Sequence, residues 1–157
     1  MAERWGLPPF RRGERARVTE GVVHDVPVRI LKPTTYMNRS GAALASLRAE
    51  PGFEPARDLL ILVDEFALPA GTFRIRADGS AGGHNGLKSI EGALLSQAYA
   101  RLRIGVGPLP EGIGDWSDYV LGEFDPEQRE QLEALRPKLE DAVDRWVVEG
   151  LPQNYSG

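Results

Sequence analysis

The stretch that decides the fold is Asp58–Gly105, DLLILVDEFALPAGTFRIRADGSAGGHNGLKSIEGALLSQAYARLRIG. It opens with the apolar run Leu59–Val63, which has the length of a buried strand and delivers Asp64 and Glu65 at its carboxyl end. Residues Thr72–Arg76 alternate between apolar and basic side chains, which indicates a half-exposed strand. Because open α/β sheets carry their chemistry at the carboxyl ends of strands, we expect Asp64 to lie at a functional edge.

A glycine-rich turn and a helix follow the second strand. The turn, Gly79–Gly83, leads into the run Gly82-Gly83-His84-Asn85-Gly86, and helical spacing then relates four apolar residues, Leu87, Ile90, Leu94 and Leu95. His84 and Asn85 therefore lie at a helix start, where unpaired backbone N–H groups and the helix dipole favour anions. A further strand, Arg101–Gly105, carries arginines on one face, as the Thr72–Arg76 strand does.

Composition is typical of an ordinary globular protein. The chain has 157 residues, of which 41% are hydrophobic and 27% charged, and this length suits one domain with a proper core. We see neither an apolar run long enough to span a membrane nor a signal peptide, so we expect a cytoplasmic protein. The absence of cysteine excludes disulfides, thiolate nucleophiles and thiolate metal sites.

Charge is distributed unevenly along the chain. The net charge is −4, but residues 1–110 hold 15 of the 19 Lys and Arg and 11 of the 23 Asp and Glu, so that they carry +4 and residues 111–157 carry −8. An anionic partner could therefore bind one basic face. On charge alone, a merely solvated surface is the simpler interpretation.

The residues before Asp58 predict three short elements: the end of a helix, a β-hairpin and a second helix. Met1–Trp5 is typical of the end of a helix, and Val18–Val23 with Val26–Leu31 predicts a hairpin that turns at His24 and Asp25. A histidine in such a turn is usually a solvated loop residue. A helix is then expected at residues 42–49, preceded by an asparagine at position 38 that either caps it or projects its amide into a site.

The residues after Gly105 predict a loop and a long helix. Residues 106–117 are rich in Gly and Pro and predict a loop that could serve as a lid. Asp125-Pro126 is a strong helix start, and the helix is expected to kink at Pro137 and to end at Gly150.

Five blocks of sequence carry a resemblance to a known family: Lys32–Gly41 (KPTTYMNRSG), Val63–Glu65 with Leu68-Pro69, Gly82–Lys88 (GGHNGLK), Arg101–Gly107 (RLRIGVG) and Asp118–Gly122 (DYVLG). In this order and spacing they resemble the signature blocks of bacterial peptidyl-tRNA hydrolases. The resemblance implies a single-domain, three-layer α/β fold over residues 1–157, with a mixed, mostly parallel twisted sheet flanked by helices. It also implies hydrolysis of the ester that joins a peptide to tRNA, which recycles tRNA from prematurely released chains. No metal, organic cofactor or membrane is implied, and the protein is expected to be a monomer.

The resemblance also implies roles for particular residues. Asp64 matches the carboxylate that orients the catalytic histidine, Asn85 the asparagine near the attacked carbonyl, and His84 the histidine at the rim of the site. In the substrate-binding block the corresponding residues are Asn38, Tyr36 and Met37. Four basic residues fall where the family contacts tRNA phosphates, namely Arg74, Arg76, Arg103 and Lys88.

The sequence departs from the family at its N-terminus. The family begins with an apolar strand, a Gly-Asn-Pro-Gly turn and an Arg-His-Asn motif that supplies the general-base histidine, and this sequence has none of them. It begins inside the helix that should follow, so we expect a missing first strand and an exposed apolar edge. Either the natural protein starts upstream of Met1 or it is truncated, and the chain as written is expected to hydrolyse its substrate poorly. His24 lies too late in the chain to be the missing base.

The chemistry can also be judged from the residues alone. Ester hydrolysis at neutral pH needs a base for the attacking water and a group that holds the developing oxyanion. Asp64 and His84 are the pair that we nominate, and the alternative is that Asp64 caps a turn while His84 binds phosphate at the helix start. Three functions stay open: an esterase acting on peptidyl-tRNA, a non-catalytic RNA-binding module, and an inactive fragment.

Overall fold

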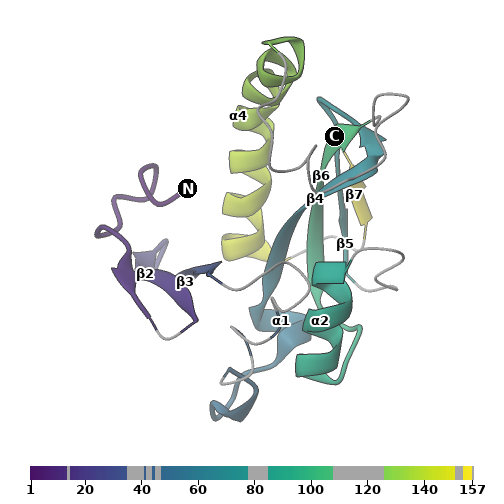
Figure 1. Cartoon of the computed structure of the whole chain (residues 1–157). Coiled ribbons are helices and arrows are strands. Elements are labelled where there is room, and N and C mark those ends of the chain that lie inside the picture. Colours follow the sequence, from purple (N-terminus) through teal and green to yellow (C-terminus); the bar gives the residue numbers. More distant parts are fainter. Residues whose placement is uncertain are drawn as a thin grey trace.

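The computed structural model describes residues 1–13, 15–34, 41, 44, 47–77, 85–107, 126–150 and 154–156 (Figure 1). The N-terminal elements are β1 (Arg11–Arg12), β2 (Ala16–Val23), β3 (Val26–Pro33), the 3-10 turn η2 (Leu47–Ala49) and α1 (Pro55–Asp58). They are followed by β4 (Leu60–Pro69), β5 (Phe73–Arg76), α2 (Asn85–Leu94), β6 (Ala100–Gly107), α4 (Pro126–Glu149) and β7 (Asn154–Ser156).

The larger sheet has four strands in the order β4-β6-β5-β7. Strands β4 and β6 run parallel, whereas β5 is antiparallel to both β6 and β7. The predicted α/β class with a mixed sheet flanked by helices is therefore confirmed, although parallel pairing is the minority among the described strand pairs. Strand β7 was not predicted, because a three-residue strand leaves almost no periodic pattern in the sequence.

Two apolar cores lie on opposite faces of this sheet and make three layers. Leu59, Ile61, Leu87, Ile90, Leu94 and Tyr99 belong to the core under α2, with Val63 packed against it. Phe73, Ile75, Leu102, Leu135, Ala142 and Val143 belong to the core under α4, with Leu60 and Ile104 packed against it. Alternate residues of each strand therefore face different helices, as the period of a strand requires.

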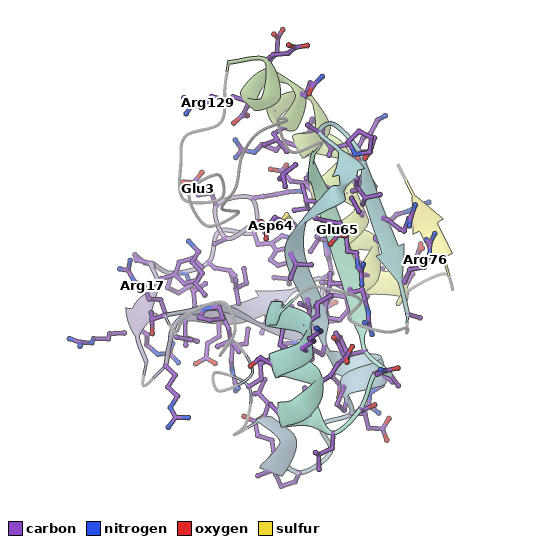
Figure 2. All side chains as sticks on the ribbon, turned by 45° about the vertical axis from the view of Figure 1, so that its right-hand side comes forward. Glu3, Arg17, Asp64, Glu65, Arg76 and Arg129 are labelled. Carbon is purple, nitrogen blue, oxygen red and sulfur yellow. The ribbon has the colours of Figure 1, made fainter. Side chains whose placement is uncertain are left out.

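The smaller sheet has three antiparallel strands in the order β1-β2-β3. The predicted hairpin is confirmed, with Val23 opposite Val26 and positive φ angles of 51° at His24 and 65° at Asp25. Two successive positive φ angles form the short turn whose twist matches that of the flanking strands. Both views show this sheet to one side of the four-stranded sheet (Figures 1 and 2).

Asp144 in α4 joins the N-terminal residues to the rest of the molecule. Trp5 Nε1 donates to Asp144 Oδ1 at 2.6 Å, and Arg4 Nη2 lies 2.6 Å from Asp144 Oδ2. His24 Nε2 lies 3.5 Å from the same carboxylate, so His24 is a half-exposed contact residue rather than a fully solvated one. Helix α4 thus holds both the first turn of the chain and the tip of the hairpin.

Strand β4 forms one edge of the four-stranded sheet, and Leu62 within it is 49% exposed. This agrees with the expected apolar edge. Helix α4 continues through Pro137 and is followed by Gly150 at a φ of 73°, as predicted for its end. No helix in the described part of the chain is both long enough and apolar enough to cross a membrane. The expected lid beyond residue 107, the cap at Asp125 and most of the expected helix at 42–49 lie outside the described residues.

Candidate active site

Four arginines occupy the α2 face of the sheet. Arg74 in β5 pairs with Arg103 in β6, and Arg76 pairs with Arg101, so that the four side chains form a square across two strands. Their neighbours Phe73 and Ile75 pack into the opposite core, which places the arginines beside α2. Each strand thus carries its two arginines on one face, as the alternation predicted.

Arg101, which is not among the predicted tRNA-binding residues, has a structural role. Its side chain is only 1% exposed, and its guanidinium lies 4.0 Å from the centroid of the Tyr99 ring. Arg101 Nη2 donates to the carbonyl of Gln97 at 2.6 Å, and Arg101 Nη1 lies 3.5 Å from Glu91 Oε1 on α2. Burial raises the pKa of the neighbouring Tyr99 to about 12. The cluster fastens α2 to β6.

The other arginines are accessible from this face. Arg74 is exposed, and Arg76 is partly buried and donates from Nη1 to its own neighbour, the carbonyl of Ile75, at 2.9 Å. Arg103 Nη1 lies 4.0 Å from Glu65 Oε2, and their side chains are 21% and 17% exposed. Glu65 was not among the predicted site residues. The alternation of β4 could have found it, because Glu65 follows Val63 by two residues and so faces α2.

Asp64 lies on the other face of β4. It pairs with Ile104, which packs in the core under α4, and it has the same parity along the strand as Leu60 in that core. Strand alternation therefore places the Asp64 carboxylate and the arginine square on different faces of the sheet. In Figure 2 Asp64 is labelled near the middle of the molecule and Arg76 at one side of it. Strand β4 continues to Pro69, so Asp64 lies within the strand and not at its carboxyl end, where it was expected. A substrate that uses both faces would have to pass the edge strand β4.

Gly41 is held against the middle of α2. Its backbone N–H donates to Ser89 Oγ at 2.9 Å, and a methyl group on its Cα would overlap the backbone carbonyl of Ser89. Gly41 is the last residue of the block that contains the expected substrate-binding residues. The helix that Gly41 contacts, α2, begins at Asn85. Lys88 is exposed on the same helix.

Several predicted residues are not placed by the structure. His84, Asn38, Tyr36 and Met37 lie outside the described residues, and only the backbone of Asn85 is described. Their contacts with Asp64 stay predictions. Among the residues that the structure does describe, no three His, Asp or Glu side chains gather as a group that could hold a metal ion.

Comparison with known proteins decides the family. The family model described as peptidyl-tRNA hydrolase matches residues 1–156. The chain belongs to the peptidyl-tRNA hydrolase family. It is 44% identical to the peptidyl-tRNA hydrolase of Gemmatimonas aurantiaca over 99% of this chain and 83% of that protein. For the peptidyl-tRNA hydrolase of Chloroflexus aggregans the identity is 43%, over 96% of this chain and 80% of the relative.

Solved structures of the family share the fold. The crystal structure of peptidyl-tRNA hydrolase from Acinetobacter baumannii is 29% identical in sequence and superposes with a TM-score of 0.82, covering 95% of this chain and 74% of that one. A complex of a peptidyl-tRNA hydrolase with N-propanol gives a TM-score of 0.83 at 28% identity, covering 94% of this chain and 74% of that one. The α/β architecture that the resemblance implied is thus that of the family.

Proposed function

We propose that this chain hydrolyses the ester bond between peptide and tRNA in peptidyl-tRNA. The observation that carries the proposal is the match to the family over residues 1–156, together with relatives of the same name at 43% and 44% identity. These comparisons do not favour the alternative of a non-catalytic RNA-binding module. The proposal includes a monomeric, cytoplasmic enzyme without a metal or organic cofactor.

The proposed roles divide between the two faces of the four-stranded sheet. Arg74, Arg76 and Arg103 would hold phosphates near the 3′ end of the tRNA on the α2 face, with Lys88 extending that surface along the helix. Charged N–H groups bind phosphate oxygens well because the hydrogen bonds are charge-assisted. The proximity of Glu65 to Arg103 would limit how tightly this arginine holds its phosphate.

The proposed chemistry lies with Asp64 in β4 and with the residues at the start of α2. Asp64 would orient the histidine that takes a proton from the attacking water. His84 is the histidine of this chain that we nominate for this role in place of the family's missing base, so turnover is expected to be low. Asn85 would stand near the attacked carbonyl at the start of α2. Asn38, Tyr36 and Met37 would position the peptide-bearing end. Gly41 supports this arrangement because it fastens the end of that block to α2.

Variants on the two faces test the proposal. Asp64→Asn and Asn85→Ala are expected to lower kcat by roughly 10² to 10⁴, the usual worth of positioned acid–base chemistry. The triple variant Arg74→Ala, Arg76→Ala, Arg103→Ala should instead raise KM and flatten the dependence of log Kd on log salt by about 0.7 to 0.9 for each phosphate that is no longer bound. Hydrolysis of purified peptidyl-tRNA and salt titrations of tRNA binding measure both effects.

Lys138→Ala serves as the control, because Lys138 is exposed on α4, on the other side of the sheet. It should leave both kcat and the salt dependence unchanged. Binding of tRNA without any hydrolysis would instead support the RNA-binding alternative. A chain that does not unfold cooperatively would identify an inactive fragment.

A further inference from the structure

Three cations lie side by side on one face of the N-terminal sheet. Arg12 in β1 is directly opposite Arg17 in β2, and Arg17 is directly opposite Lys32 in β3. Directly opposed residues project to the same face, and neighbouring strands are about 4.8 Å apart, so the row spans roughly 10 Å. All three side chains are exposed, and Arg17 is labelled in the outlying sheet in Figure 2. We call Arg12, Arg17 and Lys32 the cation row.

On the opposite face of the same sheet, the exposed arginines form ion pairs with glutamates of the protein itself. There Arg11 Nη2 lies 2.8 Å from Glu20 Oε1, and Arg29 Nε lies 3.4 Å from Glu20 Oε2. Arg29 also reaches Glu50 at 2.9 Å. Within the described residues, by contrast, no carboxylate forms an ion pair with a member of the cation row.

A row of like charges is a cost to the sheet that carries it. Like charges directly opposite each other on neighbouring strands are destabilising. Lys32 also makes a cation–π contact, since its Nζ lies 4.1 Å from the centroid of the Phe10 ring. A bound polyanion would remove the repulsion, and its phosphates could bridge charges at this spacing.

We propose that the cation row binds the phosphate backbone of the RNA portion of the substrate, as a second contact outside the arginine square. The inference rests on the proposed function, which makes an RNA the natural polyanion for this chain. Arg17 and Arg76 lie on opposite sides of Asp64 and Glu65 in Figure 2, so the row is separate from the square. Such a contact adds affinity for a long RNA and leaves the chemistry at the ester unchanged.

Two double variants with the same change of charge test this surface. Arg12→Gln with Arg17→Gln removes two members of the row, whereas Arg11→Gln with Arg29→Gln removes two exposed arginines from the opposite face. Binding of deacylated tRNA is measured between low and moderate salt. The first variant should flatten the slope of log Kd against log salt by about 1.4 to 1.8, because each phosphate that is no longer neutralised reduces the slope by about 0.7 to 0.9. The second should flatten it by less than half as much.

The stability of the first variant should be unchanged or slightly raised, because the substitution removes a like-charge pair. Thermal unfolding of both variants measures this. An unchanged salt slope in the first variant would overturn the proposal. Equal flattening in both variants would also overturn it, since it would mean that only net charge matters.

Hydrolysis assays on a long and a short substrate distinguish a failure of this inference from a failure of the proposed function. The two double variants are assayed on full-length peptidyl-tRNA and on a peptidyl ester of a trinucleotide, which is too short to span both surfaces. The first variant should raise KM several-fold for the long substrate only, with kcat unchanged on both. An equal rise of KM on the short ester would overturn the proposal. If the protein cleaves neither ester, the proposed function fails, while the binding comparison still decides whether the row holds RNA.

Discussion

Tyr99 is a buried tyrosine, and burial raises the pKa of its hydroxyl to about 12. An unfolded tyrosine ionises near pH 10. Between about pH 10 and 12 the unfolded state therefore releases a proton that the folded state keeps, and stability falls as the pH rises through this window, by up to about 3 kcal/mol in all. Below pH 10 the group has no such effect.

Tyr99→Phe should remove this alkaline loss. Urea unfolding at pH 8 and pH 11 measures it, and the variant is expected to lose about 1 kcal/mol less than the parent protein between the two pH values. The ring stays in place beside Arg101, so stability at pH 8 should change little. Equal losses in the two proteins would show that Tyr99 ionises freely in the folded state.

The same cluster shows where residue-level prediction from sequence stops. Arg101 and Arg103 belong to one alternating strand, and the alternation correctly predicted that they share a face. It could not tell that α2 covers Arg101 and leaves Arg103 accessible, because the position of a covering helix depends on packing between distant residues. Asp64 and Glu65 show the same limit: the sequence predicted two neighbouring carboxylates after the apolar run, and the strand register shows that Glu65 is the one near an arginine.

At the scale of elements, a methyl group added to either of two glycines at helix α2 should change the stability of the protein in opposite directions. Gly41 touches the helix so closely that a methyl group would overlap the carbonyl of Ser89, whereas Gly92 has no atom near the position of an added methyl group. Gly41→Ala should therefore cost about 1 to 3 kcal/mol through overpacking. Gly92→Ala should instead stabilise the protein by about 0.5 to 1 kcal/mol, because alanine is the better helix former.

Thermal unfolding and hydrolysis of peptidyl-tRNA measure the two variants together. Gly41→Ala is expected to reduce hydrolysis as well as stability, since it shifts the end of the proposed substrate-binding block away from α2. Gly92→Ala should leave hydrolysis unchanged and serves as the matched control. A Gly41→Ala protein with the parent's stability and activity would refute the close contact.

Elements with a long periodic pattern were predicted well. The apolar run before Asp64, the alternation in β5 and β6 and the stripe of α2 each follow from local sequence. Strands β1 and β7 were missed because two or three residues carry no readable period, and they exist as strands only through their partners, β2 and β5. The same limit applies to strand direction, which depends on connections rather than on residue patterns.

At the scale of the whole molecule, Asp144 connects α4 to the first turn of the chain and to the hairpin. Burial alone would raise the pKa of Asp144. The hydrogen bond from Trp5, the charge of Arg4 and the contact with His24 lower it by more than burial raises it, so the net shift of the pKa is downward. A carboxyl group whose pKa is lowered in the folded state stabilises the protein fully above its unfolded pKa, near 4. This contribution is lost as the pH falls through the folded pKa.

Asp144→Asn should therefore lower stability at pH 7, by about 1 kcal/mol for hydrogen bonds to a partly exposed charged group. It should also reduce the loss of stability between pH 5 and pH 3. Asp141→Asn is the control, because the Asp141 side chain is 70% exposed and such surface pairs contribute little. Urea unfolding at the three pH values measures both variants, and an acid profile of Asp144→Asn identical to that of Asp141→Asn would contradict the prediction.

The sequence distance between paired strands differs between the two sheets, and this has a consequence for how the chain folds as it is synthesised. Every pair in the smaller sheet joins residues fewer than twenty positions apart, for example Arg17 with Lys32, so this sheet needs only a short emerged segment. In the larger sheet Ile75 pairs with Tyr155, eighty positions later. Because distant pairs form slowly and only after both partners have emerged, β5 must wait with one edge open until β7 arrives. The surface with the cation row is therefore assembled early in translation, and the sheet that carries the proposed catalytic Asp64 is completed last.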